Sequence, residues 1–342
     1  MKRIKTALVG SYAQPDWLID REALKARLPA RVPKNDLWRV QPEHLEEAQN
    51  DAVLSVLADQ AQAGLDIVTD GEVRRESYSA PFANALDGVA RDRVASLVGR
   101  AGKPNDVPLV VGELKRSQPV HADDVRFLRA HTDRTVKITI PGPFTLSQLA
   151  VSEHHASKEA LAMNYAECVA EEIADLFAAG ADIVQLDEPY LQARVEEAEK
   201  YGVPAVNRAL DGAPGTTALH VCFGYAAMVA DKSADGYSCL PLIGRTVADQ
   251  VSIEAAQPKL DLGPALAHLE DKTVMVGVLD LGTETPETAE QVAERLRRAL
   301  RFLPPERLIA APDCGLKYME RNAARAKLRA LVDGAALVDA EG

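Results

Sequence analysis

The chain has 342 residues, of which 47% are hydrophobic and 26% charged, an ordinary composition for a globular protein. Its formal net charge is -12 at pH 7, which argues against a nucleic-acid partner because such partners require clustered Lys and Arg. Its apolar runs are shorter than the roughly 18 residues that a membrane-spanning helix needs. We therefore expect a cytoplasmic protein that binds neither nucleic acid nor membranes.

Short apolar runs rich in β-branched residues alternate with longer segments of helical periodicity, several of which end in Gly, a common helix C-cap. Apolar strands that alternate with helices indicate a parallel sheet with helices outside it. Eight repeats predict an α/β fold of the (β/α)8 TIM-barrel type. The predicted strands, in chain order, are Thr6–Ser11, Leu65–Asp70, Thr135–Gly142, Asp182–Glu188, Thr217–Phe223, Asp249–Ala255, Thr273–Leu281 and Arg307–Cys314.

Three segments, at about 16–43, 74–134 and 224–247, are longer than a minimal connection between a strand and a helix. Long loops on this fold usually belong to the active-site face. Segment 74–134 contains the string VPLVVGELKRSQP, which predicts a small hairpin over the barrel mouth. We expect a single domain that spans residues 1–342, with these three insertions.

Polar residues cluster at the carboxyl ends of the predicted strands. In a barrel all these ends meet at one mouth, where the catalytic groups of this fold are built. The sequence therefore predicts a functional site at that mouth. The residues are Gly10, Ser11, Asp70, Glu72, Asp187, Glu188, His220, Cys222, Glu254, Asp280, Asp313 and Cys314.

Four of these residues suggest a metal site. His220 and Cys222 are two apart, so on a strand they point to the same face. Glu254 and Cys314 come from the sixth and eighth predicted strands. Two thiolates, an imidazole and a carboxylate are a suitable tetrahedral set for Zn²⁺.

Other interpretations of these residue types remain open. Four cysteines do not form a disulfide framework in a chain of this length, and Cys168 lies in a predicted helix, where we expect it to pack. Cys239 is an alternative ligand. A histidine near an apolar strand is often a hydrogen-bonded core residue, and Asp70 or Asp187 could cap a following helix.

Eight strings along nearly the whole chain carry a family resemblance. They are VGSYAQPDWL, DIVTDGEVRRESY, KITIPGPFTL, VQLDEPYL, HVCFGY, VSIEAA, GVLDLGTETPE and PDCGLK. Together they resemble the catalytic domain of cobalamin-independent methionine synthase, in the form of its short single-barrel members. The resemblance implies a barrel with a catalytic zinc ion, whose ligands would be His220, Cys222, Glu254 and Cys314.

The resemblance also implies a substrate and a reaction. The family's homocysteine pocket falls on Gly10, Ser11, Glu72 and Asp187, and the carboxylates of Glu72 and Asp187 would take the catalytic role of holding the substrate's ammonium group. The expected reaction is methyl transfer to the homocysteine thiol to give methionine. Zinc would keep that thiol deprotonated for SN2 attack on the methyl carbon.

One departure from the family pattern concerns the methyl donor. The family places a histidine after the aspartate of strand seven, in a D-x-H-S pattern, whereas Gly282 stands there in this chain. Glycine cannot transfer a proton. Either another group serves as the acid for methyl-tetrahydrofolate, or the donor is a methyl-corrinoid, which leaves without protonation.

Three rival functions are alternatives to this one. The first is zinc-dependent alkyl transfer to another thiol such as coenzyme M, as in epoxyalkane:coenzyme M transferases. The second, a uroporphyrinogen-decarboxylase-like barrel, needs an arginine-rich pocket, and only Arg74 and Arg75 approach the predicted mouth. The third is a non-catalytic scaffold, which would lack metal ligands. Further partners left open are a second copy of the chain and a protein that delivers the donor.

Overall fold

The computed structural model describes residues 4–26, 29–99, 102–224, 232 and 236–341. Within these residues, eight strands form one parallel sheet in the order β1-β13-β12-β11-β10-β9-β7-β2. An isolated bridge between Ala7 and Ile67 joins the two ends of that order, so the sheet forms a nearly closed barrel. The strands are β1 (Lys5–Thr6), β2 (Ile67–Val68), β7 (Thr135–Pro141), β9 (Ile183–Asp187), β10 (Thr216–Val221), β11 (Gln250–Ile253), β12 (Thr273–Leu279) and β13 (Leu308–Pro312).

The predicted (β/α)8 fold is confirmed, and each predicted strand overlaps an observed one. The observed strands are shorter at their carboxyl ends, because the chain leaves the hydrogen-bonded ladder before most of the polar residues of the predicted site; Asp187 and His220 still lie within β9 and β10. Cys222 and Glu254 directly follow β10 and β11, and Cys314 lies two residues after β13. The site is therefore built on the last residues of the strands and on the loops that follow them.

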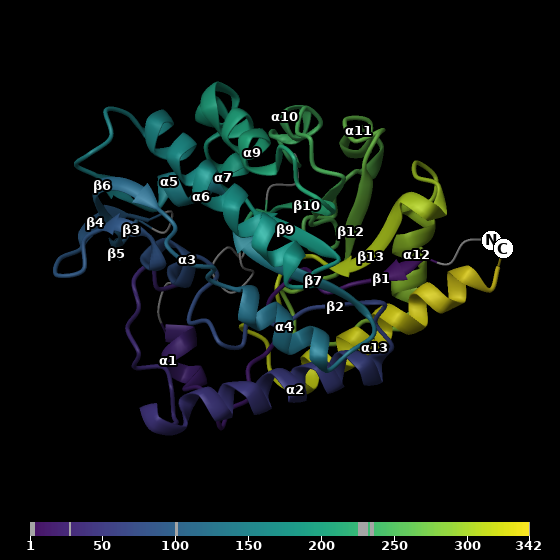
Figure 1. Ribbon diagram of the computed structural model, residues 1–342. Coiled ribbons are helices and arrows are strands. Elements are labelled where there is room, and N and C mark those ends of the chain that lie inside the picture. Colours follow the sequence, from purple (N-terminus) through teal and green to yellow (C-terminus); the bar gives the residue numbers. More distant parts are fainter. Residues whose placement is uncertain (1–3, 27–28, 100–101, 225–231, 233–235, 342) are drawn as a thin grey trace.

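Helices surround the barrel, and Figure 1 shows α2 and α13 lying side by side along one flank. The longer helices have clear start signals: the Ser157 hydroxyl accepts from the Ala160 amide, and Thr288 with Gln291 forms a capping box. The longer helices are α2 (Leu45–Ala63), α4 (Ala122–Ala130), α6 (Lys158–Ala178), α9 (Val203–Leu210), α12 (Ala289–Ala299) and α13 (Arg321–Asp339). The shorter ones are α1 (Arg21–Ala26), α3 (Ala80–Ala85), α5 (Pro143–Gln148), α7 (Pro189–Ala193), α8 (Val195–Glu197), α10 (Leu240–Ile243), α11 (Leu262–Leu266), η1 (Pro42–His44), η2 (Ala198–Gly202) and η3 (Pro305–Arg307).

The barrel interior changes from apolar to polar toward the carboxyl ends of the strands. On β9, Ile183, Gln185 and Asp187 share one face, because side chains two apart on a strand point the same way. Ile183 belongs to a buried apolar cluster, whereas Gln185 and Asp187 are buried polar residues. The apolar cluster consists of Ala7, Val9, Ile67, Ile183, Ala218, Met275, Ile309 and Ala311. It forms a floor beneath the polar site.

The insertion at 74–134 adds strands outside the barrel. β3 (Asp87–Val89) pairs antiparallel with β6 (Leu109–Lys115), and β6 pairs parallel with β8 (Val151–Ser152). β4 (Ala95–Val98) and β5 (Pro104–Val107) form a separate antiparallel hairpin. The string that predicted a hairpin therefore contributes mainly the single strand β6, and the hairpin precedes it.

The other insertions are less strand-rich. Segment 16–43 holds α1 and the start of η1, and of segment 224–247 the stretches 225–231 and 233–235 lie outside the described residues. The single-domain boundary remains a prediction. Among the described helices, none is long and apolar enough to cross a membrane.

Gly142 makes room for a carboxylate that joins β9 to α5. Glu188 accepts hydrogen bonds from the amides of Phe144 and Thr145, at 2.9 and 2.8 Å. A Cβ atom at position 142 would lie 2.2 Å from Glu188 Oε1. We expect Gly142→Ala to lower the free energy of unfolding by about 2 kcal/mol, since overpacking forces neighbouring atoms to shift.

Denaturant unfolding measures this effect, with Gly99→Ala as the matched control. The nearest atom to a Cβ at position 99 would be the Lys103 carbonyl oxygen at 3.6 Å, an ordinary contact. Equal stability of the two variants would contradict the expected role of Gly142.

Candidate metal centre

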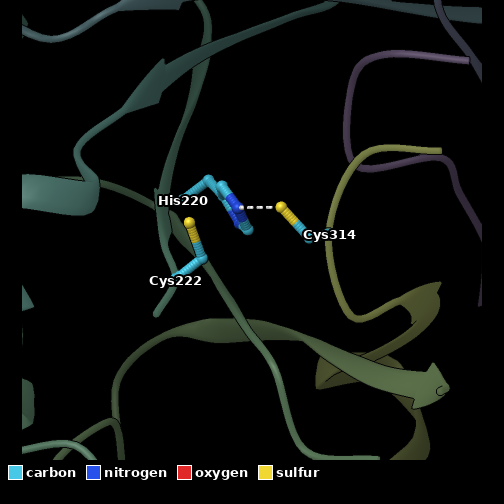
Figure 2. A group of neighbouring side chains, drawn as sticks. All are labelled: His220, Cys222 and Cys314. Atoms are coloured by element: carbon cyan, nitrogen blue, oxygen red, sulfur yellow. Dashed lines mark hydrogen bonds between the residues drawn. The ribbon is translucent and has the colours of Figure 1, made fainter. Parts of the chain in front are cut away.

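Three of the four predicted ligands lie together at the mouth of the barrel. Figure 2 shows the sulfur atoms of Cys222 and Cys314 on either side of the His220 ring. One ligand atom from each residue lies within 4.8 Å of the others, and all three residues are buried. Cys314 Sγ is 3.7 Å from His220 Nε2. This donor set, two sulfurs and one imidazole nitrogen, could hold a metal ion.

The ring of His220 is held by a hydroxyl group on the next strand. Ser252 on β11 is the register partner of His220 on β10, and its Oγ lies 3.0 Å from His220 Nδ1. This contact fixes the ring orientation and leaves Nε2 facing Cys314. Metal-binding histidines usually have such a partner on the other ring nitrogen.

The two thiols differ in their readiness to lose a proton. The hydrogen bond from Cys314 to Cys222 lowers the pKa of Cys222 well below its ordinary value, against the effect of burial, and His220 lowers it further. The same hydrogen bond raises the pKa of Cys314 well above its usual range, as does burial. The two thiols therefore lose their protons in coupled steps, and a cation bound between them would release the proton that is left on Cys314.

Glu254, the fourth predicted ligand, is engaged elsewhere. One oxygen accepts a hydrogen bond from the Phe223 amide at 3.1 Å, and the other forms a buried ion pair with Lys232. Burial raises the pKa of Glu254 to about 8, while Lys232 acts in the opposite direction. Its position beside Cys222 keeps it near the centre, and its role as a ligand remains a prediction.

The loop after Glu254 is anchored by the carboxylate of the residue that directly follows β13. Asp313 accepts from the amides of Ala255, Ala256 and Gln257, at 2.9, 2.9 and 2.6 Å. This residue, next to Cys314, therefore ties the two loops of the centre together. Cys168 and Cys239 stay outside the group of three among the described residues, and burial raises the pKa of each to about 12.

A cavity of about 450 Å³ opens above the three ligands. Each residue that the resemblance assigned to a substrate pocket lines it: Gly10, Ser11, Glu72 and Asp187. His220, Cys222 and Cys314 line it too, so the predicted pocket and the metal centre share one space. The β4–β5 hairpin closes part of the cavity with Leu97 and Val98, residues that the sequence had not singled out.

Glu72 is held in a strained conformation beside the cavity. Its φ angle is 54°, in the left-handed region that residues with side chains rarely adopt, and such strain often marks a functional site. Its Oε1 accepts from the Thr139 hydroxyl at 3.0 Å, whereas Oε2 is buried with no partner among the described residues. A buried carboxylate oxygen without a donor is a binding position for a cationic group.

Two glycines leave room for the side chains of Glu72 and Ser11 at the cavity wall. A Cβ atom at Gly10 would lie 2.8 Å from Glu72 Oε1, and one at Gly315 would lie 2.1 Å from Ser11 Oγ. Ser11 Oγ, like Glu72 Oε2, is buried without a partner in the described part of the chain. The glycines therefore let two unpaired polar groups approach the cavity wall.

Asp187 completes the acidic wall. It accepts a hydrogen bond from Gln185 Nε2 at 2.8 Å. Burial raises its pKa to about 7, partly offset by His220 and increased by the charge of Glu72. Gln185, Thr139 and Ser252, which orient the site residues, were missed by the sequence reasoning. A sequence signal that could have found them is the spacing of two residues between polar positions on a buried strand, as between Gln185 and Asp187.

These features define the class of protein. A parallel (β/α)8 barrel whose strand ends bring a histidine and two cysteines to one face of an acid-lined cavity has the architecture of a barrel enzyme with a candidate thiolate metal site. The family model for "Cobalamin-independent synthase, Catalytic domain" matches residues 4–337. The chain belongs to this family, the cobalamin-independent methionine synthases, and is a methyltransferase. The predicted family and enzyme class are confirmed.

Two relatives and one solved structure support the family assignment. The chain is 33% identical to a methionine synthase of Saccharolobus solfataricus, over 99% of this chain and 96% of that protein. It is 32% identical to one of Sulfolobus acidocaldarius, over 99% and 93%. A B12-independent methionine synthase from Shewanella sp. W3-18-1, solved with selenomethionine, is similar with a TM-score of 0.88 and 32% identity, over 99% of each chain.

Proposed function

We propose that this chain transfers a methyl group to the sulfur of homocysteine to give methionine, with Zn²⁺ held by His220, Cys222 and Cys314 and by Glu254 as the fourth ligand. The observation that carries the proposal is that the three ligands and two buried carboxylates, those of Glu72 and Asp187, line one cavity. The donor set fits zinc, because two sulfurs and an imidazole are ligands that it prefers. The Shewanella relative holds selenomethionine, the selenium analogue of the proposed product.

Bound zinc would supply a positive charge that keeps the acceptor thiol deprotonated at neutral pH. The chain's own residues orient the acceptor. Glu72, in the turn after β2, and Asp187, at the end of β9, would face its ammonium group, and the buried wall would keep water from the sulfur. The sulfur then attacks the methyl carbon of the donor, the S–C bond forms as the donor's bond to that carbon breaks, and the donor leaves with the electron pair.

The acidic wall favours homocysteine over a thiol without an amine, such as coenzyme M. Coenzyme M carries a sulfonate, and two carboxylates would repel it.

The methyl donor is open between methyl-tetrahydrofolate and a methyl-corrinoid. In the structure Gly282 lies close to Gln257 and Asp280, so a Cβ at this position would be 3.0 Å from Gln257 Nε2.

A donor and acceptor screen tests the proposal. Purified protein would be assayed with homocysteine or coenzyme M as the acceptor, and with methylcobalamin or methyl-tetrahydrofolate carrying one or several glutamates as the donor. We expect methionine as the product with at least one donor, and no methylated coenzyme M. Methylation of coenzyme M alone would overturn the assignment of the acceptor.

Removal of the metal gives a separate prediction. We expect a zinc-selective chelator to abolish methyl transfer and added Zn²⁺ to restore it, because the acceptor thiol is mostly protonated at neutral pH without a cation. Zinc per chain is measured by elemental analysis alongside activity, and circular dichroism checks that the protein stays folded. Full activity in metal-depleted protein would contradict the zinc assignment.

A further inference from the structure

A fully buried lysine lies inside the barrel, below the cavity. Lys137 on β7 has no exposed surface, and its Nζ is 2.6 Å from Gln185 Oε1 and 3.6 Å from Met275 Sδ. A lysine is rarely buried without an acidic partner, because removing its charge from water is costly. Lys137 contacts a neutral amide instead and does not line the cavity. Its hydrogen-bonded connection to the site therefore runs through Gln185.

The contacts form a row that leads to the cavity wall. An ammonium group can only donate hydrogen bonds, so it requires the carbonyl oxygen of Gln185 to face it. The amide nitrogen of Gln185 then points the other way, where it donates to Asp187 Oδ1 at 2.8 Å. If the amide turned over, its oxygen would face the Asp187 carboxylate and repel it.

Charge supports this arrangement. Burial lowers the pKa of Lys137 to about 7, and the negative charges of Asp187 and Glu72 act against that lowering. The acidic wall of the cavity thus favours the charged form of the lysine beneath it. The row of hydrogen bonds thus runs from the Lys137 ammonium group in the barrel interior, through the Gln185 amide, to the Asp187 carboxylate at the cavity wall.

We propose that Lys137 is a positioning residue, which fixes the amide of Gln185 and so holds the Asp187 carboxylate in the orientation that receives the ammonium group of homocysteine. The inference rests on the proposed function, because it requires an acceptor with an amine. It assigns to β7 a part in acceptor selectivity that the cavity lining alone does not reveal.

The test compares two thiols in the zinc-loaded protein. Homocysteine carries the ammonium group, and 4-mercaptobutyrate is the same chain without it. We expect Lys137→Met to raise KM for homocysteine roughly tenfold with little change in kcat, as for the loss of one hydrogen bond to a charged group. For 4-mercaptobutyrate, KM and kcat should stay as in the wild type, and zinc content should be unchanged.

Two more variants separate positioning from folding. Gln185→Met should cause the same selective loss, and the double variant should be no worse than the poorer single one, because both act through one contact. Lys272→Met is the matched control: Lys272 is buried and donates to the Thr246 carbonyl oxygen at 2.9 Å, away from the cavity. Gln185→Met keeps the test available if Lys137→Met does not fold.

The outcomes are distinct. Equal losses on both thiols, or additive effects of the two substitutions, would overturn the positioning role and leave Lys137 a structural residue. Wild-type protein that methylates neither thiol would refute the proposed function instead. In that case, calorimetric binding of methionine to the wild type and to Lys137→Met still decides the inference, since weaker binding by the variant supports it and equal binding refutes it.

Discussion

Cys314→Ser is expected to lose its zinc and with it methyl transfer. Serine places a hydroxyl where the sulfur stood, and a hydroxyl neither loses its proton at neutral pH nor offers the soft donor atom that zinc prefers. The substitution removes one of three ligand atoms that lie within 4.8 Å of each other. The loss of metal affinity should exceed the roughly 10- to 100-fold that changes to outer-shell partners cause.

Zinc per chain and initial rates measure this result, and Cys168→Ser is the matched control. Cys168 is equally buried, but it lies in α6 and outside the group of three ligands. We expect the control to retain zinc and activity. Cys314→Ser protein with wild-type zinc content would show that the ion, if present, is held elsewhere.

Asp187→Asn and Glu72→Gln are expected to weaken the use of homocysteine strongly. Each substitution keeps the size of the side chain and removes one negative charge from the cavity wall. A charge-assisted hydrogen bond is stronger than a neutral one, so we expect kcat/KM to fall by roughly 10- to 100-fold for each variant. Zinc content should not change, because neither residue belongs to the group of three.

Steady-state rates with homocysteine and with 4-mercaptobutyrate measure this effect. The amine-free thiol should be used as well as by the wild type, or better, because the wall repels its carboxylate less. Glu46→Gln, on the exposed face of α2, is the control for the loss of a charge elsewhere. Equal loss on both thiols would show that the two acids do not recognise the ammonium group.

The order of elements and the group of candidate ligands followed from the sequence. Apolar strands alternating with helices are a local pattern, and a barrel gathers all strand ends at one mouth, so the meeting of His220, Cys222 and Cys314 could be inferred before the structure. The two-residue spacing of His220 and Cys222 predicted that they share a face, and they do line the same cavity although β10 ends one residue before Cys222. The predicted hairpin was placed too late in the chain, because a β-rich string indicates a strand without naming its partner.

The contacts that orient the site depended on tertiary structure. Ser252 lies beside His220 through the register of β10 and β11, and Glu254 meets Lys232, which is 22 residues away. Sequence periodicity tells which side chains share a face, but it does not tell which residues of a neighbouring strand lie at the same level. Strand register and closure of the barrel decide that, which is why the row from Lys137 to Asp187 became visible only in the folded chain.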